Sequence, residues 1–238
     1  MMNRTDFLAT SATLVAAAAA TGPAAAQAVP GGTNLVERRA NFDEAAFAKI
    51  VGRPADIRQV FEAVAFKPGI LSNVKNTLNG LHFGYGYGAG RTAIAIAGHG
   101  PSAAYGYSDD VWTKYRIGEF FGIKDDAGST IPSNVWLKAN AAYDQNADPD
   151  DPAGMYQDAS IEMLQKRGVI MLTCHTAVEE QARNLVKKGF APAGMSASDV
   201  ASDILTHLIP GAVVVPSMIA TVAVLQAKYQ YTYAALTF

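Results

Sequence analysis

The chain has 238 residues, 50% of them hydrophobic, and a formal net charge of -2. This length is enough to bury one sizeable core, which favours a single large α/β domain. The near-zero net charge argues against nucleic-acid binding, which would need a basic face. No apolar stretch beyond the N-terminus reaches the roughly 18 residues of a membrane-spanning helix.

Residues 1–28 have the layout of a bacterial export signal. Arg4 precedes an Ala-rich apolar stretch, and the small residues that follow give a plausible cleavage site after Ala28. "RTDFLATSA" resembles a twin-arginine signal in which Thr5 replaces the second arginine, so the Sec and twin-arginine routes both stay open. An uncleaved tethering helix is the alternative. We expect a periplasmic or secreted protein.

Strand and helix signals alternate along the rest of the chain. We expect residues 29–56 to form a polar leader with a short helix, and residues 57–238 to form a single α/β domain with a long surface loop inserted at 123–154. The expected strands cover 57–66, 91–100, 169–174, 211–216 and 231–236. The expected helices cover 43–52, 69–86, 108–122, 156–168, 176–189, 196–208 and 217–230.

This alternation predicts a three-layer α/β/α fold around a mainly parallel sheet of about five strands. Ligands of such sheets bind outside the carboxyl ends of the strands. Cys174 and His99 both come at that end of an expected strand.

Cys174 is the only cysteine of the chain, so it cannot form a disulfide within it. Thr176 and Glu179 match a capping box, which predicts that a helix begins at Thr176 with Cys174 two residues ahead of the cap. The positive end of that helix favours a thiolate, and a protonated His175 would add to the effect. The alternative is a small buried residue that ends a strand.

His99 lies between two glycines after a strand, where it could act as a general base or bind neighbouring backbone. Met171, Cys174 and His175 could be part of a copper site only if residues such as His99 completed it. The sequence favours no metal and no cofactor.

Two other motifs do not fit the sites they suggest. The glycines of 83–91 follow a helix and precede a strand, which is the wrong context for a dinucleotide loop. The acidic residues of 144–151 resemble half of a calcium loop, but they lack its glycine and its final glutamate. A solvated acidic loop is the preferred interpretation.

Two segments of the second half of the chain, "GVIMLTCHTA" and "LIPGAVVVPSMIATVAVLQAKYQYTY", together resemble the DsrE/DsrF-like family of sulfur-relay proteins. Three earlier segments, "LSNVKNTLNGL", "AGHGPSAAYG" and "DDVWTKYRIGE", resemble the N-terminal half of exported members of that superfamily. The resemblance covers most of residues 57–236. It implies a three-layer fold with a five-stranded sheet, assembly as a trimer or hexamer, and a persulfide on Cys174.

Two functions follow as hypotheses. The first is an exported sulfur carrier or sulfurtransferase-like protein that uses Cys174, with His99 or His175 moving protons and with a donor or acceptor protein or a small thiol as partner. The second is a non-catalytic oligomeric protein that binds a small ligand or partner and has a structural cysteine. Whether the protein is an enzyme stays open at this point.

Overall fold

The computed structural model describes residues 39–67, 69–88, 90–143 and 154–236. The expected export signal (1–28), the leader up to residue 38 and the acidic loop (144–151) therefore lie outside the described residues. Within the described residues, no helix is both long and apolar enough to cross a membrane.

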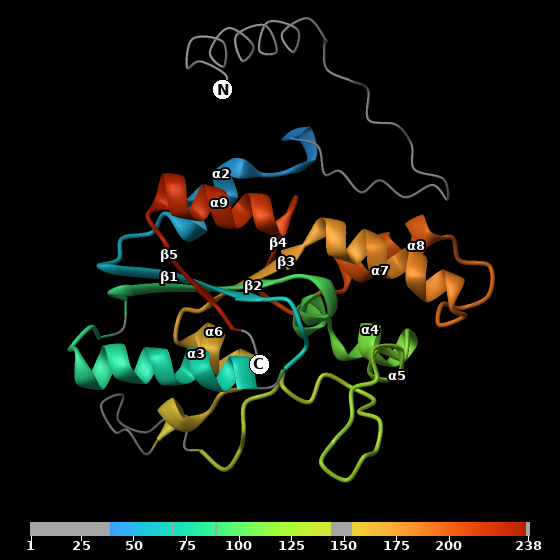
Figure 1. Ribbon diagram of the computed structural model, residues 1–238, viewed down its shortest axis with the longest axis horizontal. Helices are drawn as coiled ribbons and strands as arrows, with labels where there is room; N and C mark the ends of the chain where they lie inside the picture. The colour runs from blue at the N-terminus through green and yellow to red at the C-terminus, as the bar shows by residue number, and fades with distance from the viewer. Residues whose placement is uncertain (1–38, 68, 89, 144–153, 237–238) are drawn as a thin grey trace, which may run out of the picture.

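Five parallel strands form one sheet in the order β4-β3-β2-β1-β5 (Figure 1). The strands are β1 (Ile57–Ala63), β2 (Thr92–Gly98), β3 (Ile170–Cys174), β4 (Ala212–Val215) and β5 (Thr232–Ala235). The sequence predicts all five, and the parallel sheet confirms the expected fold class. Between β4 and β5 the chain crosses from one edge of the sheet to the other.

Helices cover both faces of the sheet (Figure 1). One face carries α2 (Glu44–Val51), α7 (His175–Lys187), α8 (Ala197–Thr206) and α9 (Met218–Tyr229), and the other carries α3 (Gly69–Asn79) and α6 (Ile161–Lys166). The central strand β2 is buried throughout, with its alanines against the first layer and Ile94 and Ile96 against the second. This is the alternation that a strand covered on both faces imposes.

The helix expected over 108–122 is two helices, so this prediction is wrong in part. α4 (Asp109–Lys114) begins after Ser108, whose side chain accepts the Val111 N–H as the sequence predicts for an N-cap. α5 (Ile117–Phe121) follows after a break at Arg116, which has a left-handed φ of 48°. The Arg116 guanidinium donates to the Gly189 carbonyl at 2.9 Å, so a distant contact holds the break in place.

The helix expected over 69–86 is also shorter than predicted. α3 ends at Asn79, and a single π-helical turn (Gly80–Gly84) replaces its last part. The Tyr85 N–H donates to the Gly80 carbonyl at 3.1 Å, which closes that turn. In the described residues between this turn and β2 (85–88 and 90–91) no helix begins, which is consistent with the rejection of a dinucleotide loop.

The described part of the insertion has neither helix nor strand between residues 123 and 143, as the sequence predicts. It is not confined to the surface, however, because Ile131 and Leu137 are buried and Trp136 packs against Phe66. The buried Asn134 side-chain amide donates to two backbone carbonyls of the segment between β2 and α4, at 3.2 and 3.0 Å. These contacts fix the segment to the core.

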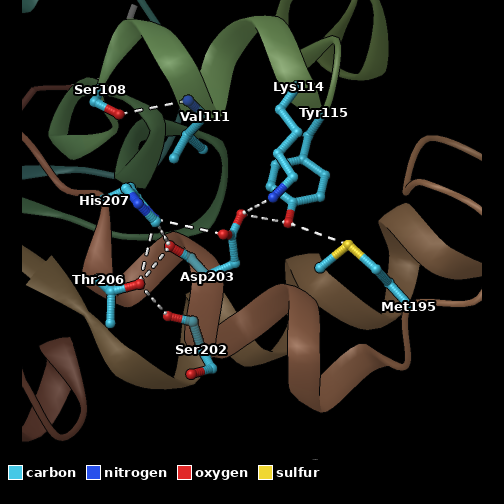
Figure 2. A network of polar contacts seen from close by, with 9 residues as sticks. All are labelled: Ser108, Val111, Lys114, Tyr115, Met195, Ser202, Asp203, Thr206 and His207. Carbon is cyan, nitrogen blue, oxygen red and sulfur yellow. Dashed lines mark hydrogen bonds and ion pairs between the residues drawn. The ribbon is translucent and has the colours of Figure 1, made fainter.

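A polar network joins α4 to α8 beyond the sheet (Figure 2). The Asp203 carboxylate accepts the Tyr115 hydroxyl at 2.6 Å and the Lys114 ammonium at 2.8 Å, and His207 Nδ1 lies 3.4 Å from its other oxygen. Burial favours the protonated acid, but the bonds from Lys114 and Tyr115 outweigh it and lower the pKa of Asp203. The network therefore stabilises the packing of these helices at neutral pH.

Candidate functional site

Cys174 is the last residue of β3 and the N-cap of α7, so strand and helix follow each other without a loop. Its side chain faces the layer of α7, α8 and α9, within the larger hydrophobic cluster. Only 4% of the residue is exposed. The sequence therefore predicts the place of the thiol at the strand end, while the structure adds that the thiol is covered.

The Cys174 sulfur lies where two helices begin. The N–H of Met218, the first residue of α9, donates to Cys174 Sγ at an N···S distance of 3.3 Å. α7 has 13 residues and α9 has 12, and the backbone dipoles of both place partial positive charge at their first turns. The sulfur therefore accepts a backbone hydrogen bond at a place where two helix starts meet, which is the kind of surroundings in which proteins bind anions.

The capping box expected at Thr176 and Glu179 is not formed, and this prediction is wrong. α7 begins one residue earlier, at His175, with no side-chain cap. The Thr176 hydroxyl donates instead to the Pro216 carbonyl at 3.1 Å. This bond joins the first turn of α7 to the turn that leads from β4 into α9, and so helps to bring the Met218 N–H to Cys174.

His175 is buried beside Cys174, with 8% of the residue exposed. Its Nε2 lies 3.8 Å from a carboxylate oxygen of Glu179, one turn further along α7. The structure thus places a buried imidazole and a carboxylate next to the residue that carries the thiol. An imidazole held near a carboxylate is a suitable proton acceptor.

His99 lies at the same edge of the sheet, directly after the neighbouring strand β2. Gly98 pairs with Thr173, so the next residues, His99 and Cys174, are level with each other. The His99 ring extends the other way, however, and its Nε2 lies 2.8 Å from Glu62 Oε1 on β1. The structure therefore brings His99 and Cys174 to one edge but directs the imidazole to a different partner.

Glu62 and Tyr233 complete a polar group that sequence reasoning missed. The Tyr233 hydroxyl, on β5, donates to the second carboxylate oxygen of Glu62. This hydrogen bond, with smaller effects from burial and from the Glu62 charge, raises the pKa of Tyr233. Glu62 is the one acidic residue of β1 and was the available signal. Its partner on β5 follows only from the strand order.

A depression of about 310 Å³ lies at the carboxyl edge, between α7 and the loop after β2. It is lined by Gly100, Pro101, Phe120, Phe121, Ala177, Glu180, Gln181, Asn184 and Lys188. A second depression of about 330 Å³ shares Pro101 and Phe121 with it and extends towards the loop after β1. Sheets of this type bind ligands at this edge, so the depressions lie where the topology predicts a site.

In the described part of the chain, no three His, Cys, Asp or Glu side chains form a group that could hold a metal ion. Met171, considered with Cys174 as a copper ligand, packs into the hydrophobic cluster on the opposite face of the sheet. A copper site that joins Met171 to Cys174 is therefore ruled out by geometry. Comparison of the chain with protein-family models, with curated proteins and with solved structures finds no match.

Proposed function

We propose that the protein is an exported, DsrE-like sulfur carrier that holds sulfur as a persulfide on Cys174. The observation that carries this proposal is the hydrogen bond from the Met218 N–H to Cys174 Sγ at the start of two helices. An attacking sulfur anion gains from such a donor, and the positive first turns of the two helices also suit the outer sulfur of a persulfide, which carries its charge. The thiol is also at the edge of the sheet where this fold binds ligands.

The transfer needs no external oxidant or reductant. The Cys174 thiolate attacks the sulfane sulfur of a persulfide or polysulfide donor, and a new S–S bond forms while the donor's S–S bond breaks. The electron pair of the broken bond leaves with the donor thiolate. An acceptor thiolate then removes the outer sulfur from Cys174 in the same way. His175, beside Glu179, is suited to take the thiol proton in the first step.

Burial has a consequence for this chemistry. With Cys174 only 4% exposed, the thiol reacts when the covering groups move, and a persulfide is shielded from oxidants between reactions. Outside the cytoplasm this shielding protects the carried sulfur. A covered sulfur is thus compatible with carriage, provided that an entry route exists.

The test is intact-mass measurement of the folded protein after treatment with inorganic polysulfide. We expect the mass of one added sulfur atom, which is lost on reduction and absent in Cys174→Ser. If folded protein gains no sulfur while urea-unfolded protein does, Cys174 is not a carrier.

The second candidate is a non-catalytic protein that binds a small ligand in the depression, with Cys174 as a packing residue. The low exposure of Cys174 and the mixed apolar and polar lining of the depression favour it. Iodoacetamide discriminates the two functions, because a packing residue is alkylated only through global unfolding. A carrier is alkylated while the chain is folded.

The proposal includes export and self-association. Cleavage near Ala28 is tested by N-terminal sequencing of protein recovered from the periplasm or medium. The outward face of α9 supports self-association, because Ile219 and Val224 are 61% and 42% exposed there. Sedimentation should give a trimer or hexamer, which Ile219→Lys dissociates.

A further inference from the structure

Gln181 closes the space between α7 and the loop after β2. Its Oε1 accepts the Tyr107 hydroxyl at 2.6 Å, and its Nε2 donates to the Gly100 carbonyl at 2.5 Å. Only 6% of Gln181 is exposed, and Tyr107 is fully buried. A buried amide with both ends bonded is held in a single orientation.

The depression lies on the outer side of this amide, and Gln181, Gly100 and Ala177 are all part of its wall. Ala177 is three residues after Cys174, so the two are neighbours on one face of α7. The wall of the depression therefore continues inward, along the helix, to the residue that carries the thiol.

Tyr107 lies on the inner side of the amide. Burial strongly raises the pKa of its phenol, and the charge of a Cys174 thiolate raises it further. Tyr107 also packs with Cys174 and Ala177 in the same buried hydrophobic cluster. Gln181, which accepts the Tyr107 hydroxyl and lines the depression, therefore lies between this cluster and the depression.

We propose that Gln181 is the cover of Cys174, and that the depression is the entry route to the thiol when the amide swings away from Tyr107 and Gly100. This inference rests on the proposed function, because it says how a sulfur donor reaches the carrier thiol. Gln181 is a positioning residue and takes no part in the bond changes. A ligand that occupies the depression and holds the amide closed would slow the reaction of Cys174.

The effect of the cover on thiol reactivity follows from the bonds that opening breaks. Two buried hydrogen bonds are lost, and we expect their removal to raise the rate of Cys174 alkylation about thirtyfold. The experiment measures the rate of iodoacetamide alkylation by intact mass, using the single cysteine of the full chain. Two variants remove the bonds: Gln181→Ala, which also leaves a void, and Gln181→Met, which keeps most of the side-chain volume.

Two control variants separate opening of the cover from loss of stability. Asn184→Ala alters the same wall but leaves the cover in place, and we expect the wild-type rate. Val200→Ala destabilises the adjacent α8 without touching the depression. It should accelerate alkylation only through global unfolding, so its rate rises steeply with dilute urea. The rates of the Gln181 variants should hardly depend on urea, because opening is local.

The outcomes distinguish this inference from the proposed function. The inference is overturned if both Gln181 variants are alkylated at the wild-type rate. It is also overturned if their faster alkylation rises steeply with urea, as alkylation through global unfolding does. If the Gln181 variants are alkylated faster, but neither they nor the wild type gains sulfur from polysulfide, the covering role of Gln181 is supported and the sulfur-carrier function is contradicted. If the wild type gains sulfur and the Gln181 variants are alkylated no faster, the sulfur-carrier function is supported and the covering role of Gln181 is contradicted.

Discussion

Replacing Met218 with its α-hydroxy acid should remove the N–H that donates to Cys174 Sγ while leaving α9 in place. This change turns the Ser217–Met218 amide into an ester and keeps the buried Met218 side chain. Because Met218 is the first residue of α9, its N–H makes no bond within the helix, so the ester breaks none. The ester therefore tests this hydrogen bond with little change in the backbone.

The expected effect is on the rate at which Cys174 takes up sulfur. A hydrogen bond to the attacking sulfur is worth about 1 kcal/mol, which is about fivefold in rate. The ester also weakens the Ser217 carbonyl, which accepts the Thr221 N–H. The matched control is therefore the same ester at Ile219, which weakens the Met218 carbonyl but keeps the Met218 N–H.

The assay is the rate of sulfur uptake by folded protein in inorganic polysulfide, followed by intact mass at a fixed pH. We expect the Met218 ester to gain sulfur about fivefold more slowly than the Ile219 ester. Equal rates would refute the reasoning, since the donor would then do nothing for a reacting sulfur.

Three further predictions concern stability and ionisation. Asp203→Asn should lower the free energy of unfolding in urea by about 2 kcal/mol at pH 7. Because the folded pKa of Asp203 is lowered, this stability is present above about pH 4 and lost as the pH falls through the folded value, so wild type and variant should converge in acid. Glu62→Gln should return the pKa of Tyr233 towards about 10 in a spectrophotometric titration, and an unchanged value would contradict the assigned bond. Gly118→Ala would put a Cβ onto the Ile131 carbonyl oxygen, so the urea midpoint should fall by the equivalent of about 3 kcal/mol, whereas a neutral result would contradict this packing.

Local patterns in the sequence were sufficient to predict the alternating elements. The continuous apolar run before Cys174 identifies a strand covered on both faces, and the structure buries every residue of β3. The cap at Thr176 failed because its hydroxyl has a partner in the turn before α9, 40 residues away. The break at Arg116 also depends on a distant carbonyl, and no glycine marks it in the sequence.

The surroundings of the candidate site depend on contacts between distant segments, so local patterns could not predict them. Glu62 meets Tyr233 only because β5 pairs with β1, and nothing in the sequence of either strand says which edge β5 joins. The cover over Cys174 needs Tyr107 and Gln181, which are 74 residues apart. Sequence reasoning therefore located the thiol but not the groups that decide its access.

The measurement that tests the central claim most directly is the mass of folded wild-type protein after polysulfide treatment. The account predicts one additional sulfur atom on Cys174, released by reductant and missing in Cys174→Ser. A folded protein whose mass stays unchanged, while the urea-unfolded chain takes up sulfur, would contradict it.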